Sequence, residues 1–165
     1  FVREGLENLG ARFNLVREPF HITERVMTTG EVPMVTDYEH VEDNLFVREG
    51  SEFHRDSLAD DLALIIDADF GLVVILGCAH RGIVNTLRRA QHLTGRRQVY
   101  AAIGGTHLFR ASRERVERTA VDLKEMGLQK LGVSHCTGFF ASAKLYQEFG
   151  EAFFLNNAGT SLTFP

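Results

Sequence analysis

Residues 72–80 read Leu72-Val73-Val74-Ile75-Leu76-Gly77-Cys78-Ala79-His80, an apolar run followed by small residues and a histidine. The same order recurs in Val99-Tyr100-Ala101-Ala102-Ile103-Gly104-Gly105-Thr106-His107 and in Leu131-Gly132-Val133-Ser134-His135-Cys136-Thr137-Gly138. Branched apolar runs of this length are typical of buried strands. Small residues let backbones approach closely, and α/β folds assemble their sites at the carboxyl ends of strands. The three segments therefore predict a buried sheet whose strands end near a shared group of histidines.

The segments around these strands predict an α/β fold. Residues 62–66 form another apolar run, and the turn at 67–71 predicts a hairpin with residues 72–76. Residues 82–94 carry apolar side chains at helical spacing, and Ser112 is the expected N-cap of a helix that stops at Gly127. The other expected elements are a helix over 139–149 and strands over 98–103, 130–134, 152–155 and 161–164.

The first 61 residues are less regular. Residues 26–30 and 31–36 fit short strands, whereas residues 37–61 form a charged stretch with Phe46 and Phe53 as isolated apolar anchors. We interpret residues 1–61 as a connecting or lid segment and residues 62–165 as the unit that contains the site.

Composition and charge narrow the function classes. The 165 residues are 44% hydrophobic and 24% charged, as in ordinary globular chains, with a net charge of −4. Residues 1–61 contain 6 basic and 14 acidic side chains, a net charge of −8, whereas residues 62–165 contain 12 and 8, a net charge of +4. The basic part favours a small anionic ligand. Nucleic acid is not expected as a partner, because the arginine pairs lack interleaved aromatic residues. No apolar run approaches the roughly 20 residues that a membrane span needs.

The chain ends and the cysteines suggest a piece of a cytoplasmic protein. The chain begins without Met and shows no signal peptide, so we expect a fragment. Cys78 and Cys136 are too few for a disulfide framework and suit a reducing cytoplasm.

Histidines at the ends of three strands predict a metal site. Neutral imidazole is the commonest ligand for divalent transition metals, so the pattern suits zinc, with manganese or iron as alternatives. For any one of these histidines, the alternative is an ordinary hydrogen-bonded side chain. The threefold repetition favours the shared site.

Four motifs resemble a known family. The runs Gly77-Cys78-Ala79-His80-Arg81-Gly82-Ile83-Val84-Asn85, Gly104-Gly105-Thr106-His107-Leu108 and His135-Cys136-Thr137-Gly138, preceded by Asp60-Asp61-Leu62-Ala63-Leu64, resemble the second half of the metallo-β-lactamase-fold hydrolases. Within them the resemblance is to the branch related to dihydropterin ribofuranosyl-aminobenzene phosphate synthases. The stretch Thr29-Gly30-Glu31-Val32-Pro33 resembles that branch's segment between its two halves.

The resemblance implies the second half of an α/β/β/α sandwich with one or two metals between the halves. It also implies a first-half His-x-His-x-Asp-His motif, which these 165 residues do not contain. Therefore the chain looks like the C-terminal half of a hydrolase that needs its missing half or a homo-oligomer as partner. The alternative is a non-catalytic binding or assembly module that another chain completes. A doubly wound nucleotide-binding domain is disfavoured, because no Gly-x-Gly-x-x-Gly follows a first strand.

By the same resemblance, His135 matches the last metal histidine of the family and His80 a second ligand. Cys78 competes with His80 for the shared-metal role, or is a small buried thiol beneath the site. His107 lines the pocket as a catalytic proton donor or as a substrate contact. Asp60 and Asp61 supply a carboxylate ligand or a hydrogen-bond acceptor for a ligand histidine, or are simply a charged entry to a strand.

The implied chemistry is metal-assisted hydrolysis of a small anionic or phosphorylated substrate. The helices after His80 and His135 begin near Arg81 and near Thr137 and Gly138. We expect their free N–H groups and positive dipole ends to bind phosphate, which makes these three residues the candidate substrate contacts. An apolar sheet face should also remain where the other half would pack. We expect the missing half, a second copy or residues 1–61 to cover it.

Overall fold

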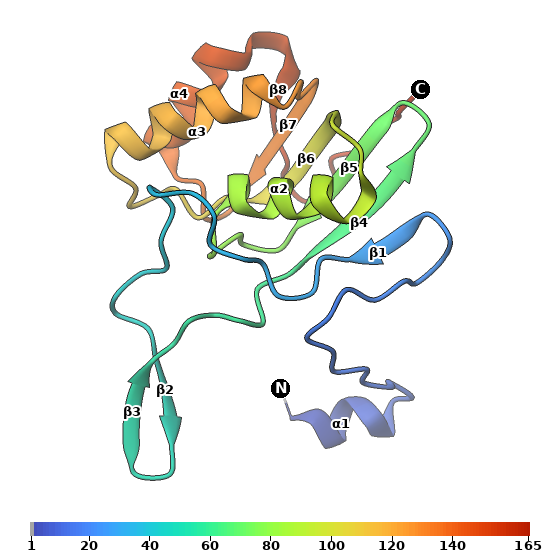
Figure 1. The fold of residues 1–165 in the computed structure, drawn as a ribbon, viewed down its shortest axis with the longest axis vertical. Coiled ribbons are helices and arrows are strands. Elements are labelled where there is room, and N and C mark those ends of the chain that lie inside the picture. Colours follow the sequence, from blue (N-terminus) through green and yellow to red (C-terminus); the bar gives the residue numbers. More distant parts are fainter. Residues whose placement is uncertain (1) are drawn as a thin grey trace.

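A computed structural model describes residues 2–165 and shows a mixed α/β arrangement with helices on one face of a sheet (Figure 1). Within these residues the main sheet has the strand order β1-β4-β5-β6-β7-β8. Its strands are β1 (Val26–Thr28), β4 (Ala63–Ala68), β5 (Gly71–Leu76), β6 (Val99–Gly105), β7 (Lys130–Ser134) and β8 (Phe153–Leu155). The strand pairs from β5 to β8 are parallel, and β4 pairs antiparallel with β1 and β5. The α/β prediction is confirmed, and with it the hairpin of β4 and β5.

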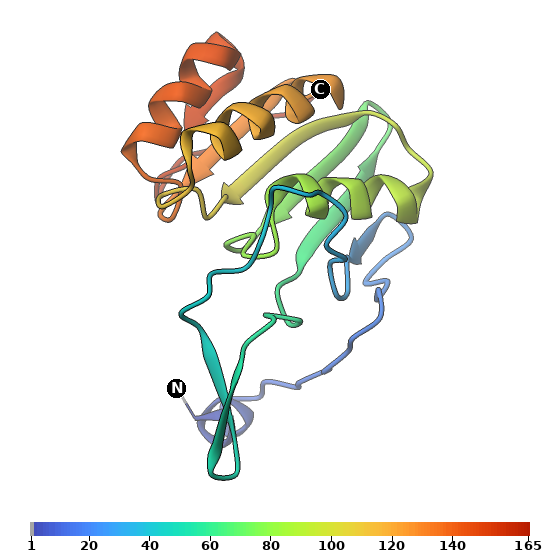
Figure 2. The same ribbon diagram turned by 60° about the vertical axis from the view of Figure 1, so that its left-hand side comes forward.

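Three helices cover one face of the sheet: α2 (Ile83–Thr94), α3 (Arg113–Glu125) and α4 (Phe139–Phe149). Figure 2 shows α3 and α4 side by side, with α2 lying across the strands. A single apolar cluster fills the space between the two layers, with Leu87, Leu123 and Leu145 from the helices fully buried against Leu72 and Leu131 from the strands. The expected cap of α3 is confirmed, because the Ser112 hydroxyl accepts a hydrogen bond from the Arg115 N–H at 3.1 Å. None of the helices among the described residues is long and apolar enough to span a membrane.

Two expected strands are absent from the structure. Residues 31–36 form no strand, because the N–H groups of Val35 and Thr36 donate to the Asn85 side chain on α2 instead of to a neighbouring strand. Residues 161–164 also form none. The chain turns at Asn157–Thr160 after β8, and Phe164 packs sideways against Phe70 and Tyr100.

The second face of the sheet is covered in part. Val73, Ala101 and Ile103 are buried there, and Phe164 from the C-terminal tail is one of the side chains packed around them. The apolar cluster on this face contains none of the described residues 2–61. The sequence predicts that the missing half, a second copy or residues 1–61 cover this face. The described residues 2–61 do not cover it. Coverage by a missing half or a second copy stays a prediction.

Among the described residues, the acidic first third of the chain buries side chains against the sheet and the helices only in its middle. In residues 2–61, the buried side chains of Met27, Thr29, Val32 and Glu39 lie beside β4 and α2. The hairpin of β2 (Phe46–Glu49) and β3 (Glu52–Arg55) projects away from the sheet, as does α1 (Arg3–Asn8), in both views (Figures 1 and 2). Phe46 is 56% exposed and Phe53 is 68% exposed, so the prediction that they anchor this stretch is wrong. No part of the chain that the structure describes packs against the hairpin closely enough to bury them.

Candidate metal centre

Three donor side chains meet at the ends of β5 and β7. One ligand atom from each of Cys78, His135 and Cys136 lies within 4.8 Å of the other two. In the described part of the chain, these three residues form a group that could hold a metal ion. The Cys78 sulfur is 3.1 Å from Nε2 of His135, and the other ring nitrogen, Nδ1, is 3.2 Å from the Ser134 hydroxyl. Thiolate sulfur and imidazole nitrogen are the ligands that zinc takes in proteins. The donor set therefore fits the expected metal.

Glycine on the intervening strand lets these residues approach. β6 lies between β5 and β7, and its last residue is Gly105. A Cβ atom at Gly105 would lie 2.6 Å from the Cys136 sulfur and 2.8 Å from a carbon of the His135 ring. Any side chain there would push the two loops apart. The small residues of the repeated sequence pattern thus have a specific role, which is to clear the space above β6.

His80 lies beside His107 instead of in the cysteine cluster. The two ring centroids are 4.0 Å apart. Among the described residues, Nδ1 of His80 and both ring nitrogens of His107 are buried without a hydrogen-bond partner. Burying a polar atom without a partner costs free energy, so such atoms are suited to bind a ligand. The structure therefore separates Cys78 and His135 from a second imidazole pair.

Left-handed backbone turns produce this separation. Ala79 has φ of 52° and His107 has φ of 47°, a region that residues with a Cβ rarely adopt. Ala79 lies between Cys78 and His80, so the turn sends these two side chains to different neighbours. Strained backbone of this kind is commonly found at functional sites.

The pKa of His107 is lowered, first by burial and then by the nearby charge of His80. Glu42 opposes the shift, with its carboxylate oxygen 3.5 Å from Nε2 of His107. Burial likewise raises the pKa of the Cys136 thiol. Both changes favour the neutral forms of these side chains in the absence of a cation.

Asp61 and Arg81 form a second contact at the edge of the site. The Arg81 N–H donates to the Asp61 carboxylate at 2.9 Å, and burial raises the pKa of that carboxyl. The Arg81 guanidinium is buried and donates to the carbonyl of Ser57 at 3.1 Å and to Glu31 at 3.3 Å. Its role as a substrate contact stays a prediction. Asp60 is exposed, and both aspartates lie just before β4. This position agrees with the alternative that they form a charged entry to the strand.

The two helix starts differ from each other. Glu39 occupies the beginning of α2, where its carboxylate accepts hydrogen bonds from the N–H groups of Val84 at 3.0 Å and Asn85 at 2.8 Å. An anionic ligand would have to compete with this carboxylate, contrary to the expectation of free N–H groups there. α4 begins at Gly138 with no side-chain cap. Thr137 is buried, and its hydroxyl joins the β6 and β7 loops by bonding to Thr106 and to the Ser134 carbonyl, each at 2.9 Å.

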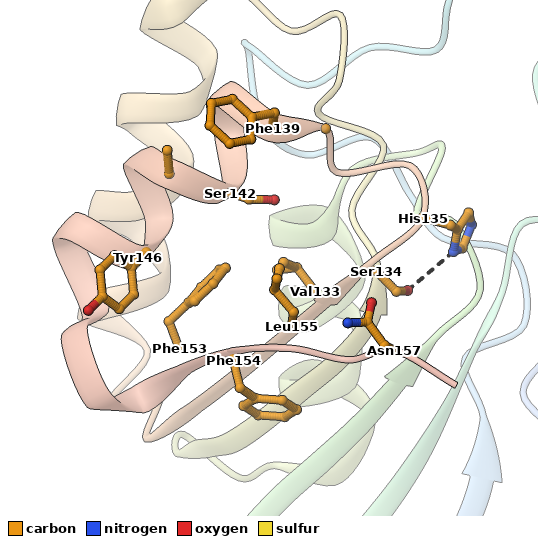
Figure 3. Close-up of a pocket in the computed structure, with 12 residues that line it drawn as sticks. Val133, Ser134, His135, Phe139, Ser142, Tyr146, Phe153, Phe154, Leu155 and Asn157 are labelled. Atoms are coloured by element: carbon orange, nitrogen blue, oxygen red, sulfur yellow. Dashed lines mark hydrogen bonds between the residues drawn. The ribbon is translucent and has the colours of Figure 1, made fainter. Parts of the chain in front are cut away.

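A cavity of about 620 Å³ opens beside His135, between α4 and the edge formed by β7 and β8 (Figure 3). Its walls include Ser134, Gly138, Phe139, Tyr146 and Phe153. Figure 3 shows His135 at one end and the aromatic side chains at the other. The cavity therefore offers space for a small molecule with a polar end near His135 and an apolar remainder.

Two residues at the site lacked a sequence signal of their own. Cys136 belongs to the motif after β7, but its position next to a histidine did not by itself mark it as a donor. Glu42 lies in an irregular acidic stretch, and no periodicity indicates that it reaches His107. Both residues reach the site only because the fold brings loops that are distant in sequence side by side.

Comparison with known proteins extends these observations. No family model matches the chain. The chain is 34% identical, over 99% of its length, to 56% of the 7,8-dihydropterin-6-methyl-4-(beta-D-ribofuranosyl)-aminobenzene-5'-phosphate synthase of Methanocaldococcus jannaschii. It is 29% identical, over 83% of its length, to 50% of an uncharacterized protein of the same organism. The chain thus spans about half the length of these relatives.

A solved structure has the same fold. The crystal structure of Tm1679, described as a metal-dependent hydrolase of the β-lactamase superfamily, superposes with a TM-score of 0.83 and 27% identity. The match covers 93% of this chain and 58% of Tm1679. The resemblance to the metallo-β-lactamase superfamily, and to the branch of the dihydropterin synthase, is confirmed by these matches.

Proposed function

We propose that this chain supplies the C-terminal half of a metal-dependent hydrolase that acts on a small anionic or phosphorylated substrate. The observation that carries the proposal is the meeting of Cys78, His135 and Cys136 at the carboxyl ends of parallel strands. In the proposed enzyme these residues hold a divalent metal, with zinc preferred because two of the three donors are sulfur. When bound, such a metal activates water and polarises the scissile bond.

The substrate class follows from the residues around the cluster. The uncapped N–H groups at the start of α4 lie directly after the β7 loop, and helix starts of this kind bind phosphate. His107 offers unpartnered ring nitrogens, which suit a hydrogen bond to a substrate oxygen or a proton transfer. The name of the methanogen relative specifies a 5'-phosphate together with pterin and aminobenzene groups, which supports an anionic substrate with an aromatic part.

The remaining ligands belong to a partner in this proposal. The relatives are about twice as long as the chain, and the chain contains no His-x-His-x-Asp-His string. We infer that a first half, on the same polypeptide or on a second chain, completes the centre. A cytoplasmic location stays a prediction from the two cysteines.

The test measures metal content and hydrolysis of p-nitrophenyl phosphate. It uses this chain alone and together with the polypeptide that contains the first-half motif. We expect tight metal binding and turnover only when both parts are present, and loss of both in His135→Ala. The matched control is His92→Ala, because His92 is an exposed histidine on α2, in its last turn.

Two results would contradict the proposal. Turnover by the isolated chain would show that no other half is needed. Tight metal binding by the complete assembly without hydrolysis of any phosphoester would favour the second candidate, a non-catalytic binding or assembly module.

A further inference from the structure

The two thiols of the chain lie close together across the end of β6. Cys78 follows β5 and Cys136 follows β7, and their sulfur atoms belong to the group within 4.8 Å. The Cys136 sulfur is also 3.6 Å from the carbonyl oxygen of Cys78. These are the only cysteines in the sequence, and both are free in the structure. The fold has therefore brought together two thiols that lie 58 residues apart.

The surroundings allow the sulfur atoms to approach further. Both cysteines lie in loops after the strands, outside the hydrogen-bonded ladder of the sheet. Gly105 leaves the space between the loops open. A disulfide needs the sulfur atoms about 2.0 Å apart, so the side chains must rotate and the two loops must move closer together. Both side chains are partly exposed, so a small oxidant can reach them.

We propose that Cys78 and Cys136 form a reversible disulfide on oxidation, and that this bond disables the candidate metal centre. With hydrogen peroxide as oxidant, the Cys78 sulfur attacks one peroxide oxygen, the O–O bond breaks, and a sulfenic acid and one water form. The Cys136 sulfur then attacks the Cys78 sulfur, and the displaced hydroxyl leaves as a second water. Two thiols are oxidised, one peroxide is reduced, and the two thiol protons leave in the two waters.

Cys78 is the better first target. Its sulfur contacts a side-chain atom, Nε2 of the exposed His135, at 3.1 Å, and that side chain can rotate away to admit the oxidant. Cys136 donates instead toward a carbonyl oxygen and accepts from the N–H of His107 at 3.3 Å. A reactive thiol beside a second, resolving thiol is the arrangement found in redox-sensing proteins.

The disulfide and the metal exclude each other. A metal is bound by thiolate sulfur, whereas a disulfide sulfur is a poor ligand. Oxidation would therefore remove two of the three donors and leave only His135 in the cluster. This inference depends on the donor cluster and not on hydrolysis, so it can succeed or fail independently of the proposed activity.

The first experiment follows the thiols of the complete 165-residue chain after a chelator has removed all metal. The chain is treated with increasing hydrogen peroxide, and free thiols and intact mass are measured under non-reducing, denaturing conditions. We expect the thiol count to fall from two to none, the monomer mass to fall by two hydrogens, and dithiothreitol to reverse both changes. Covalent dimers, or a monomer that gains oxygen instead, would overturn the proposal.

Single variants separate the two roles. In Cys136→Ser no internal disulfide can form, so we expect a sulfenic acid at Cys78 that dimedone traps. In Cys78→Ser we expect several-fold slower oxidation of the remaining thiol. Equal rates in the two variants would contradict the assignment of Cys78 as the first target.

Cadmium gives a direct readout of the shared thiols. We expect the reduced chain in excess Cd²⁺, which compensates for the weak binding expected of one half alone, to show thiolate-to-cadmium ultraviolet absorption. The oxidised chain should show none until dithiothreitol is added. Cd²⁺ added before peroxide should slow disulfide formation several-fold. Disulfide formation at the same rate with and without Cd²⁺ would overturn the link between oxidation and the metal centre.

Discussion

Residues 62–165 and the hairpin within residues 40–61 differ in how deeply their side chains are buried. In residues 62–165, strands and helices bury one another, and the apolar cluster between them contains most of the buried side chains. In residues 40–61 no residue is fully buried, although the stretch contains two strands. Residues 26–39 lie between these extremes, because they attach through a few specific contacts. Strand formation alone therefore does not stabilise a segment, since stability needs a second layer to pack against.

Hydrogen exchange should show the largest difference between these regions. The amides of β2 and β3 pair with each other in an exposed hairpin, whereas β5 and β6 lie in the middle of the sheet. We expect the amides of β5 and β6 to exchange only on global unfolding and those of the hairpin to exchange at almost no cost. The free energies of opening should therefore differ by about 5 kcal/mol or more. Similar protection in the hairpin and in β5 would contradict this description.

Core truncation should show the next largest effect. Leu87 on α2 is fully buried in the apolar cluster, so Leu87→Ala should lower the free energy of unfolding by about 2–5 kcal/mol. The matched change in the hairpin is Phe53→Ala, at a side chain that is 68% exposed. We expect a change within about 0.5 kcal/mol for that variant. Denaturant unfolding measures both, and a large loss in Phe53→Ala would show that the hairpin packs against something in solution.

A substitution in residues 26–39 should show an intermediate loss of stability. Glu39→Ala removes the acceptor for two buried N–H groups at the start of α2, so we expect a loss of about 1–3 kcal/mol in stability. Glu49→Ala, at an exposed position on β2, is the control and should change little. Thermal unfolding of both variants tests this. An unchanged melting temperature in Glu39→Ala would mean that residues 31–39 do not stabilise α2.

The smallest expected effect is a pH-dependent ion pair. Glu148 on α4 accepts hydrogen bonds from Lys124 at 2.5 Å and Lys144 at 2.7 Å, and these lower its pKa from 4.5 to about 2. Because the folded-state pKa lies below the unfolded value, the stabilisation is fully present above about pH 4.5. It is lost as the pH falls through about 2.

Two variants test this pair by comparing melting temperatures across that pH range. Glu148→Gln should melt slightly below the parent chain at neutral pH, and the difference should shrink toward about pH 2. Asp43→Asn breaks the ion pair with Arg55 in the hairpin region and should not change the melting temperature at any pH. A pH-independent difference for Glu148→Gln would mean that packing, not charge, is responsible.

Local sequence patterns were enough for most of the elements and for the edge of the sheet where the site lies. Apolar runs, helical spacing and the Ser112 cap depend on neighbours a few residues apart, and α2, α3, β5, β6 and β7 lie where these patterns predict them. The resemblance of the strand-end motifs also led to the correct fold. The misplaced strands at 31–36 and 161–164 are segments whose partners are side chains elsewhere, and no local pattern reports such partners.

The tertiary structure alone decided which donors meet. The left-handed turn at Ala79 separates Cys78 from His80, and the space above Gly105 lets Cys136 join His135. Glu39 reaches the start of α2 from 45 residues away, and Glu42 reaches His107 across 65 residues of sequence. The sequence determined that histidines would lie at the ends of three strands, because strand position and length follow from local patterns of apolar and small residues. Their pairing depends on loop angles and on contacts between distant segments, which exist only once the chain has folded.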